Sequence, residues 1–201
     1  MILQDNFYTL CQIFSSNSQI QKRLWSEIEV NYSTSNRYYH TLKHLDYIYT
    51  SLQNIKIDTI TEFAIFYHDI IYDVRKKDNE KRSAYLAKQR LNELNVPKEI
   101  QEEVSKLIIK TQTHQGKNQR DNLFLDADLA ILASPIEVYQ NYIENIRKEY
   151  FIYNDEVYKS GRKEVLGFFL QKERLYNSDY FHKRYENKAR KNLESELKSL
   201  S

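Results

Sequence analysis

The sequence predicts an all-α fold, a single-domain helical bundle. Apolar residues recur every three to four positions along almost the whole chain, which is the spacing of amphipathic helices rather than of strands. The chain has only 3 Gly and 2 Pro in 201 residues, so it offers little material for the tight turns of β and Rossmann-type folds. At roughly 100–200 residues per domain, this length fits one domain, residues 1–201, with a continuous core.

The apolar spacing also locates the individual helices. It predicts them near 3–15, 18–31, 38–53, 59–73, 77–95, 97–114, 122–133, 135–152 and 154–171, with a last one near 178–199. Two of these segments begin with the pattern of a capped helix, a serine or threonine followed three positions later by an acid. The pattern is formed by Thr59 with Glu62, and by Ser134 with Glu137, where Pro135 also suits the first helical position.

Charge and cysteine content exclude several classes of protein. With 30 Lys+Arg against 28 Asp+Glu, the formal charge of +2 provides no strong field for nucleic acid, so nucleic-acid binding is disfavoured. Cys11 is the only cysteine, which rules out an internal disulfide and a thiolate zinc site and predicts a reducing, cytoplasmic setting. The first residues lack a signal-peptide pattern, and no apolar window of about 18 residues occurs, so no membrane partner is expected.

Histidines in two segments are candidates for chemistry. His40 and His44 are four residues apart, so on a helix their imidazoles lie one turn apart on one face. His68 and Asp69 are adjacent within an apolar segment, and buried ionisable groups need a partner or a metal. Histidines that simply hydrogen-bond to the backbone are the alternative interpretation.

A third candidate segment contains two acids, Asp126 and Asp128, in an otherwise apolar run. On a continuous helix, Asp128 lies within the stripe of Leu125, Leu129 and Leu132, which makes it the better inward-facing ligand than Asp126. Acids near a helix N-terminus, where they interact favourably with the helix dipole, are the alternative.

Together, these segments supply a candidate ligand set of two imidazoles and two carboxylates. Such a mixed nitrogen and oxygen shell suits a divalent metal ion, namely Mn, Fe, Co, Ni, Zn or Mg. The set consists of His44, His68, Asp69 and Asp128.

The order of these segments resembles the HD-domain superfamily of metal-dependent phosphohydrolases, in which a histidine, an adjacent His-Asp pair and a distant aspartate lie on helices. More narrowly, the chain looks like a group of small bacterial proteins described as predicted HD phosphohydrolases. The resemblance runs from about residue 30 to the C-terminus, with the motif-bearing core at about 30–175. It is carried by Arg37-Tyr38-Tyr39-His40-Thr41-Leu42-Lys43-His44, Phe66-Tyr67-His68-Asp69-Ile70-Ile71-Tyr72-Asp73, Asn79-Glu80-Lys81-Arg82-Ser83-Ala84, Phe124-Leu125-Asp126-Ala127-Asp128-Leu129-Ala130-Ile131-Leu132, and Gly161-Arg162 with Val165-Leu166.

The resemblance implies an HD-type helical bundle that hydrolyses a phosphate ester, such as a nucleotide or another phosphomonoester, with a divalent ion on the ligand set above. By similarity to cyclic-nucleotide phosphodiesterases, His40 would be the general acid, and Asp69 would bridge two ions if a second one binds. The remaining expected roles concern the small phosphorylated substrate. Arg37, Lys43 and Arg162 are expected to contact phosphate, Glu80 to orient a ligand or water, and His114 to contact substrate or a second ion.

A protein of another class fits the same residues. A catalytically inactive HD-like signalling module could keep the metal or a nucleotide as a ligand without hydrolysing anything. Metal-dependent hydrolysis of a phosphoester distinguishes the two hypotheses, and the sequence is compatible with any oligomeric state.

Overall fold

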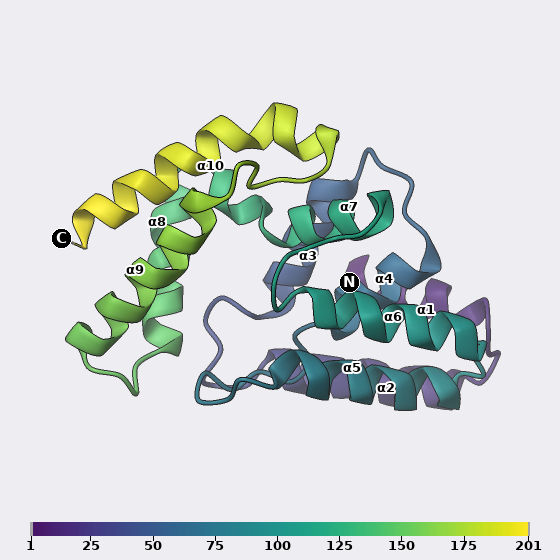
Figure 1. Ribbon diagram of the computed structural model, residues 1–201. Coiled ribbons are helices and arrows are strands. Elements are labelled where there is room, and N and C mark those ends of the chain that lie inside the picture. Colours follow the sequence, from purple (N-terminus) through teal and green to yellow (C-terminus); the bar gives the residue numbers. More distant parts are fainter. Residues whose placement is uncertain (1, 201) are drawn as a thin grey trace. The chain divides into compact units, whose positions relative to one another are not determined.

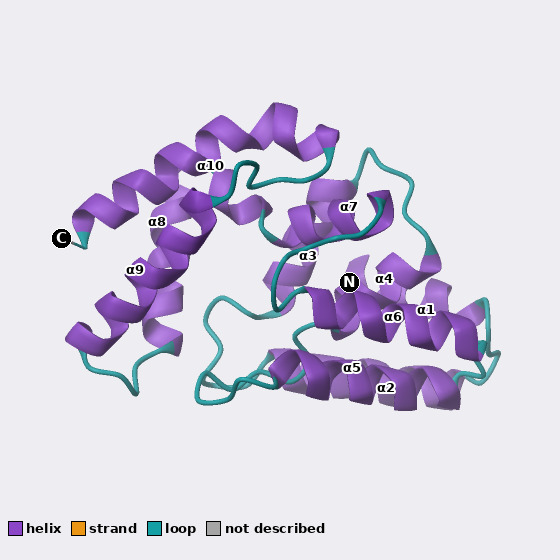
Figure 2. Ribbon diagram, in the orientation of Figure 1, coloured by secondary structure: helices purple, strands orange, loops and turns teal. Residues whose placement is uncertain are grey.

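The computed structural model describes residues 2–200, in which ten α-helices and one 3-10 helix occur and no strand (Figure 2). The all-α prediction is therefore confirmed for this part of the chain. None of its helices is long and apolar enough to cross a membrane.

The chain forms two compact units, Met1–Gln115 and Gly116–Ser201. The helices of the first unit are α1 (Ile2–Gln12), α2 (Ser18–Tyr32), α3 (Leu42–Leu52), α4 (Thr59–Tyr67), α5 (Asn79–Glu93) and α6 (Lys98–Lys110). Those of the second unit are α7 (Gln119–Asp128), the 3-10 helix η1 (Ala130–Ala133), α8 (Ile136–Glu149), α9 (Asp155–Gln171) and α10 (Asp179–Ser199). The sequence-based assignment of one domain to residues 1–201 stays a prediction.

Helix α4 is the central element of the first unit. It packs against α1, α3, α5 and α6, and α5 and α6 lie side by side (Figure 1). All side chains from Phe63 to Tyr67 are fully buried, and the ring of Phe66 packs edge-on against that of Phe7 with centroids 5.0 Å apart. Because the C-terminal half of α4 is buried on every side, the residues at this end of the helix have a fixed position.

In the second unit, α10 packs along α9, η1 and α7 (Figure 1). Arg162 on α9 and Glu196 on α10 form a buried ion pair, with 2.6 Å between Nε and Oε1. The carboxylate of Glu196 also accepts a hydrogen bond of 2.5 Å from the hydroxyl of Tyr139 on α8. Helices α8, α9 and α10 are thus joined through one buried carboxylate.

Several predicted helices are shorter in the structure, and three of these differences concern His40 and the candidate metal ligands. The helix expected at 38–53 begins only at Leu42, and the helix expected at 59–73 ends at Tyr67. The segment expected as a helix at 122–133 is α-helical only as far as Asp128 and then becomes 3-10. The candidate residues therefore lie at helix ends and in turns rather than in the middle of helices.

Candidate metal centre

Two helix ends of the first unit bring the candidate ligands together. His44 lies in the first turn of α3, which begins after Thr41, a residue in extended conformation with φ −109° and ψ −179°. His68 caps the C-terminal end of α4, and Asp69 follows it in a turn. The prediction that His40 shares a helix face with His44 is wrong, because residues 38–41 are not helical.

His40 nevertheless lies in the same cluster. Its Nε2 is 3.9 Å from Oδ2 of Asp69, and the centroids of the His40 and His44 rings are 5.7 Å apart. The same carboxylate oxygen is 3.9 Å from Nε2 of His44 and 3.3 Å from Nε2 of His68. Three imidazole nitrogens therefore surround a single carboxylate oxygen.

The side chains of this cluster differ in their exposure to solvent. The His44 and His68 side chains are only 2% and 1% exposed, whereas those of His40 and Asp69 are 17% and 18% exposed. Solvent and small ligands therefore reach the cluster from the side of His40 and Asp69.

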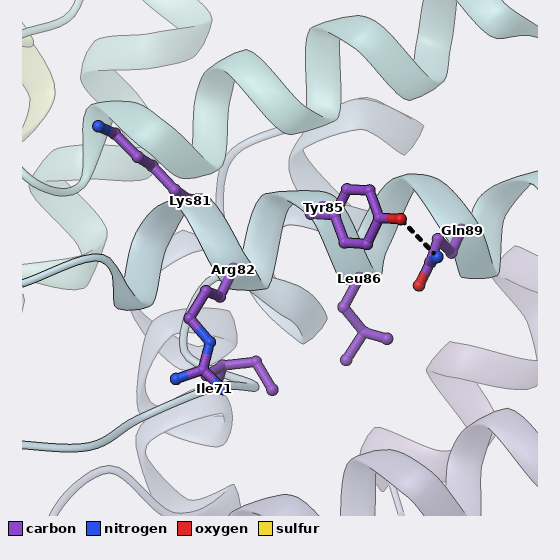
Figure 3. A pocket seen from close by; sticks show the side chains of 6 residues that line it. All are labelled: Ile71, Lys81, Arg82, Tyr85, Leu86 and Gln89. Carbon is purple, nitrogen blue, oxygen red and sulfur yellow. Dashed lines mark hydrogen bonds between the residues drawn. The ribbon is translucent and has the colours of Figure 1, made fainter. Parts of the chain in front are cut away.

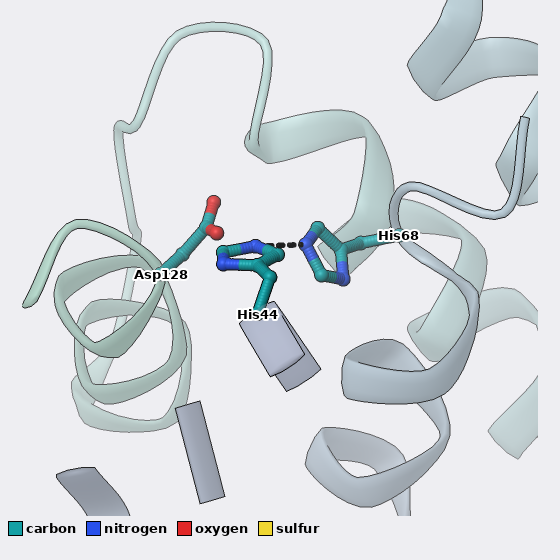
Figure 4. A group of neighbouring side chains, drawn as sticks. All are labelled: His44, His68 and Asp128. Carbon is teal, nitrogen blue, oxygen red and sulfur yellow. Dashed lines mark hydrogen bonds between the residues drawn. The ribbon is translucent and has the colours of Figure 1, made fainter. Parts of the chain in front are cut away.

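The hydrogen bonds of His68 define its tautomer. Its Nδ1 lies 3.0 Å from the carbonyl oxygen of Ile65. A carbonyl can only accept, so Nδ1 carries the proton, and in the neutral ring Nε2 carries the lone pair. This Nε2 faces Nε2 of His44 at 3.1 Å (Figure 4). A backbone carbonyl that orients an imidazole in this way is the usual arrangement behind a metal-ligating histidine.

The spacing of these atoms fits coordination of one ion. Ligand atoms about 2.1 Å from an ion stand roughly 3.0–3.4 Å apart at octahedral or tetrahedral angles. The distances of 3.1 Å between the two Nε2 atoms and 3.3 Å from His68 to Asp69 fall in this range. The same 3.1 Å also suits a direct hydrogen bond, with Nε2–H of His44 donating to Nε2 of His68.

Asp126 and Asp128 have different surroundings within the second unit. Asp126 is 1% exposed, and its carboxylate accepts hydrogen bonds from the backbone N–H groups of Asn177 at 2.9 Å and Ser178 at 2.7 Å. Burial nevertheless raises the pKa of Asp126 above its ordinary value, because desolvation outweighs these hydrogen bonds. Asp128 is half-buried at the last residue of α7.

The stripe argument for Asp128 assumed a helix that continues to Leu132, whereas α7 ends at Asp128 and a 3-10 helix follows. The choice of Asp128 over Asp126 is not contradicted by this difference, although Asp126 is the more buried acid. Asp126 is occupied by the turn that precedes α10. Asp128 offers a carboxylate oxygen as a possible metal ligand. His44, His68 and Asp128 each offer one atom to which a metal ion can bind, and Figure 4 draws the three side chains.

Arg37, which was expected to contact phosphate, serves the backbone instead. It is 7% exposed, and its Nη1 donates to the carbonyl oxygens of His40 at 3.1 Å and Asp69 at 2.6 Å. Its Nη2 donates to the carbonyl oxygen of Ile70 at 2.9 Å. The guanidinium thus ties the loop that carries His40 to the turn that carries Asp69.

The other residues that were expected to contact the substrate differ in burial and in position. Lys43 is exposed at the start of α3, Glu80 is half-buried in the first turn of α5, and His114 is half-buried with a positive φ of 50°. Arg162 is buried in the ion pair of the second unit, so its guanidinium is already neutralised by a carboxylate.

A shallow groove also runs along α5 in the first unit (Figure 3). Two of its lining residues are hydrogen-bonded to each other, with Nε2 of Gln89 donating at 3.0 Å to the hydroxyl of the exposed Tyr85. None of the residues expected in the site lines this groove, whose lining consists of Ile71, Lys81, Arg82, Tyr85, Leu86 and Gln89.

Sequence reasoning missed two tyrosines of the cluster. Tyr72 stacks on His40, with ring centroids 4.2 Å apart and an interplanar angle of 29°. The hydroxyl of Tyr32 accepts a hydrogen bond of 3.2 Å from the backbone N–H of Asp69. With 17 tyrosines in the chain, composition marks neither, although Tyr72 stands only three residues after Asp69.

No known family model matches the chain, and no curated protein or solved structure matches it either.

Proposed function

We propose that this protein is a metal-dependent phosphohydrolase that acts on a phosphate ester. The observation that carries the proposal is the convergence of Nε2 of His44, Nε2 of His68 and Oδ2 of Asp69, with the tautomer of His68 set by the carbonyl of Ile65. This is a nitrogen and oxygen donor set for a divalent ion of the series from Mn to Zn, or for Mg.

His44, His68 and Asp69 hold the ion, and the role of Asp128 as a further ligand stays a prediction from the sequence. When bound, such an ion neutralises charge on the phosphoryl oxygens and lowers the pKa of water toward neutrality. Burial of the two histidines keeps bulk water from competing for their nitrogens. Asp69, which is more exposed, faces the substrate side and would be the bridging carboxylate if a second ion binds.

His40 gives a proton to the leaving oxygen of the substrate. It lies at the exposed side of the cluster, and imidazole is the side chain most often used for proton transfer near neutral pH. Lys43 is exposed next to His44 and is a candidate to contact phosphate. The substrate is a nucleotide or another small phosphomonoester, and the single cysteine is consistent with work in the reducing cytoplasm.

The test is a screen of phosphorylated metabolites with the purified protein, in the presence of each candidate ion and after chelation. Hydrolysis that requires an ion and is abolished in His68→Ala supports the proposal. His182→Ala serves as the matched control, since this histidine belongs to the second unit and contacts Glu186. Activity that is equal with and without chelator, or unchanged in His68→Ala, contradicts it.

One observation favours the second candidate, a catalytically inactive module that binds a metal or nucleotide. The guanidiniums of Arg37 and Arg162 are both occupied within the protein, which removes two of the expected phosphate contacts. Metal binding that depends on His68, without hydrolysis of any phosphorylated compound, is the outcome that identifies such a module.

A further inference from the structure

His40 lies in a segment that is not helical, so no helix fixes the direction of its imidazole. Residues 38–41 are bends, and the exposed fraction of the side chain is 17%. The torsion about the bond to an imidazole ring is broad, so a histidine in such a loop can present either ring edge to a substrate. A group that transfers a proton must instead hold one nitrogen at a defined position.

Two neighbouring residues restrict this ring. The ring of Tyr72 stacks on it at 4.2 Å, and the ring of Tyr39 meets it edge-on at 4.9 Å. Stacking by Tyr72 fixes the plane of the imidazole, because a rotated ring would lose this face-to-face contact. In the stacked orientation Nε2 is directed to the carboxylate of Asp69, 3.9 Å away.

Arg37 holds the partner of this stack in place. Its guanidinium lies over the ring of Tyr72 at 5.5 Å and over the ring of Tyr32 at 4.8 Å. The same guanidinium binds the carbonyl oxygens of His40 and Asp69. The buried guanidinium of Arg37 therefore contacts the backbone at His40, the backbone at Asp69 and the ring of Tyr72.

We propose that Tyr72 is a positioning residue, which holds the imidazole of His40 by stacking so that Nε2 is presented at the edge of the metal centre. This inference rests on the proposed function for its catalytic consequence, whereas the stacking itself is independent of it. The contact requires an aromatic face and not the phenolic hydroxyl.

The experiment compares Tyr72→Leu with Tyr72→Phe, which keeps the ring. Nuclear magnetic resonance at one fixed pH follows the ring protons of His40, assigned by their loss in His40→Gln. The upfield ring-current shift of these protons is expected in wild type and Tyr72→Phe and absent in Tyr72→Leu. The same shift in all three proteins overturns the proposal.

Kinetics then test the role. Tyr72→Leu is expected to lower kcat by roughly 10²-fold, the scale of loss for a misplaced catalytic group, with KM and metal content close to wild type. Tyr72→Phe, which keeps the aromatic ring, is expected to have a kcat within about threefold of wild type. Loss of metal in Tyr72→Leu, or equal kcat in Leu and Phe variants, overturns the positioning role.

Failure of the proposed function gives a different result. A wild-type protein without hydrolytic activity, but with the ring-current difference between the Leu and Phe variants, refutes the phosphohydrolase and supports the stacking. Circular dichroism and urea midpoints for both variants separate these outcomes from a failure to fold.

Discussion

The two ring nitrogens of His68 have separate tasks. Nδ1 is bound to the carbonyl of Ile65 on the preceding turn, so the ring is anchored to α4 through its own backbone. Nε2 faces His44 and Asp69 at 3.1 and 3.3 Å. Because residues 63–67 of α4 are fully buried, the direction of the Nε2 lone pair is set by the core and not by the loop that follows.

At this scale, the role assigned to His40 predicts a separation between metal binding and turnover. His40→Ala should leave the metal content nearly unchanged and lower kcat by roughly 10²–10⁴-fold, most strongly for substrates with poor leaving groups. Elemental analysis and steady-state kinetics measure the two quantities. If the variant loses its metal, His40 is a ligand; if neither quantity changes, it only packs against Tyr72.

Glu186 gives a prediction about pH. Burial by itself would raise the pKa of this carboxyl, but the backbone N–H groups of Leu175 and Tyr176 and the guanidinium of Arg190 outweigh it and lower the pKa below the ordinary value of 4.5. A carboxyl with a lowered folded-state pKa stabilises the protein fully above its unfolded pKa. That contribution is lost as the pH falls through the folded pKa.

Glu186→Gln should therefore lower the free energy of unfolding by about 1–3 kcal/mol at pH 7, because two backbone donors lose a charged acceptor. The difference from wild type should shrink as the pH falls below 4.5. Urea denaturation at pH 7 and at low pH measures it, with Glu194→Gln on the exposed face of α10 as the control. A difference that is constant with pH would refute the assignment.

At the scale of helices, periodicity predicted where each helix lies but not where the site-bearing helices end. The segments at 38–41 and 68–73 have helical spacing, yet their carbonyl groups accept hydrogen bonds from Arg37, a residue distant from the second segment in sequence. The N–H of Ile71 likewise pairs with the hydroxyl of Ser83 on α5. Such tertiary hydrogen bonds replace helical ones, and no local pattern reveals them.

The end of α7 has a similar cause. The carbonyl oxygen of Leu129 accepts a hydrogen bond of 3.0 Å from the hydroxyl of Tyr176, and that of Leu132 accepts one of 2.8 Å from the side chain of Asn192. These partners lie 47 and 60 residues further along the chain, so the local sequence could not show that the helix ends at Asp128.

The residue predicted to cap the N-terminus of α4 differs by one position from the observed one. Asp58, not Thr59, caps this helix, and its Oδ1 accepts hydrogen bonds from the N–H and the hydroxyl of Thr61. At α8, Ser134 makes no capping hydrogen bond and the helix begins after Pro135. The residue types were correctly identified as helix starts, but the register depends on backbone angles that the sequence alone does not define.

The pair of Arg162 and Glu196 predicts how strongly α9 and α10 are coupled. Arg162→Ala leaves a carboxylate that is 3% exposed without its cation, which should cost about 3–5 kcal/mol in the free energy of unfolding. The double variant Arg162→Met with Glu196→Leu should recover most of this loss, because it removes the uncompensated charge. Urea denaturation compares the three proteins. If the double variant is as unstable as Arg162→Ala, the loss comes from packing.

For the molecule as a whole, Cys11 provides a probe of unfolding. It is fully buried among α1 and its neighbours, and burial raises the pKa of its thiol to about 12. Because the thiolate is the reactive form, a thiol reagent at pH 8 should label the native protein only through opening of the first unit. Rapid labelling of the folded protein would contradict this burial.

Metal binding should also be visible in the stability of the protein. An ion that binds only the folded state stabilises it by about 2.7 kcal/mol at a concentration of about 100 times its Kd. The net charge of +2 gives no general attraction for cations, so such stabilisation must come from specific ligands.

The most direct test of the account is the divalent metal content of purified wild-type protein and of His68→Ala, measured by elemental analysis after incubation with each candidate ion and removal of the excess. We predict at least about one equivalent of a divalent ion in the wild type and less than about one tenth of that in the variant, since loss of even a supporting group lowers affinity by about 10–100-fold. A folded wild-type protein that retains no ion, or a variant that retains as much as wild type, would contradict the assignment of His44, His68 and Asp69 as a metal centre.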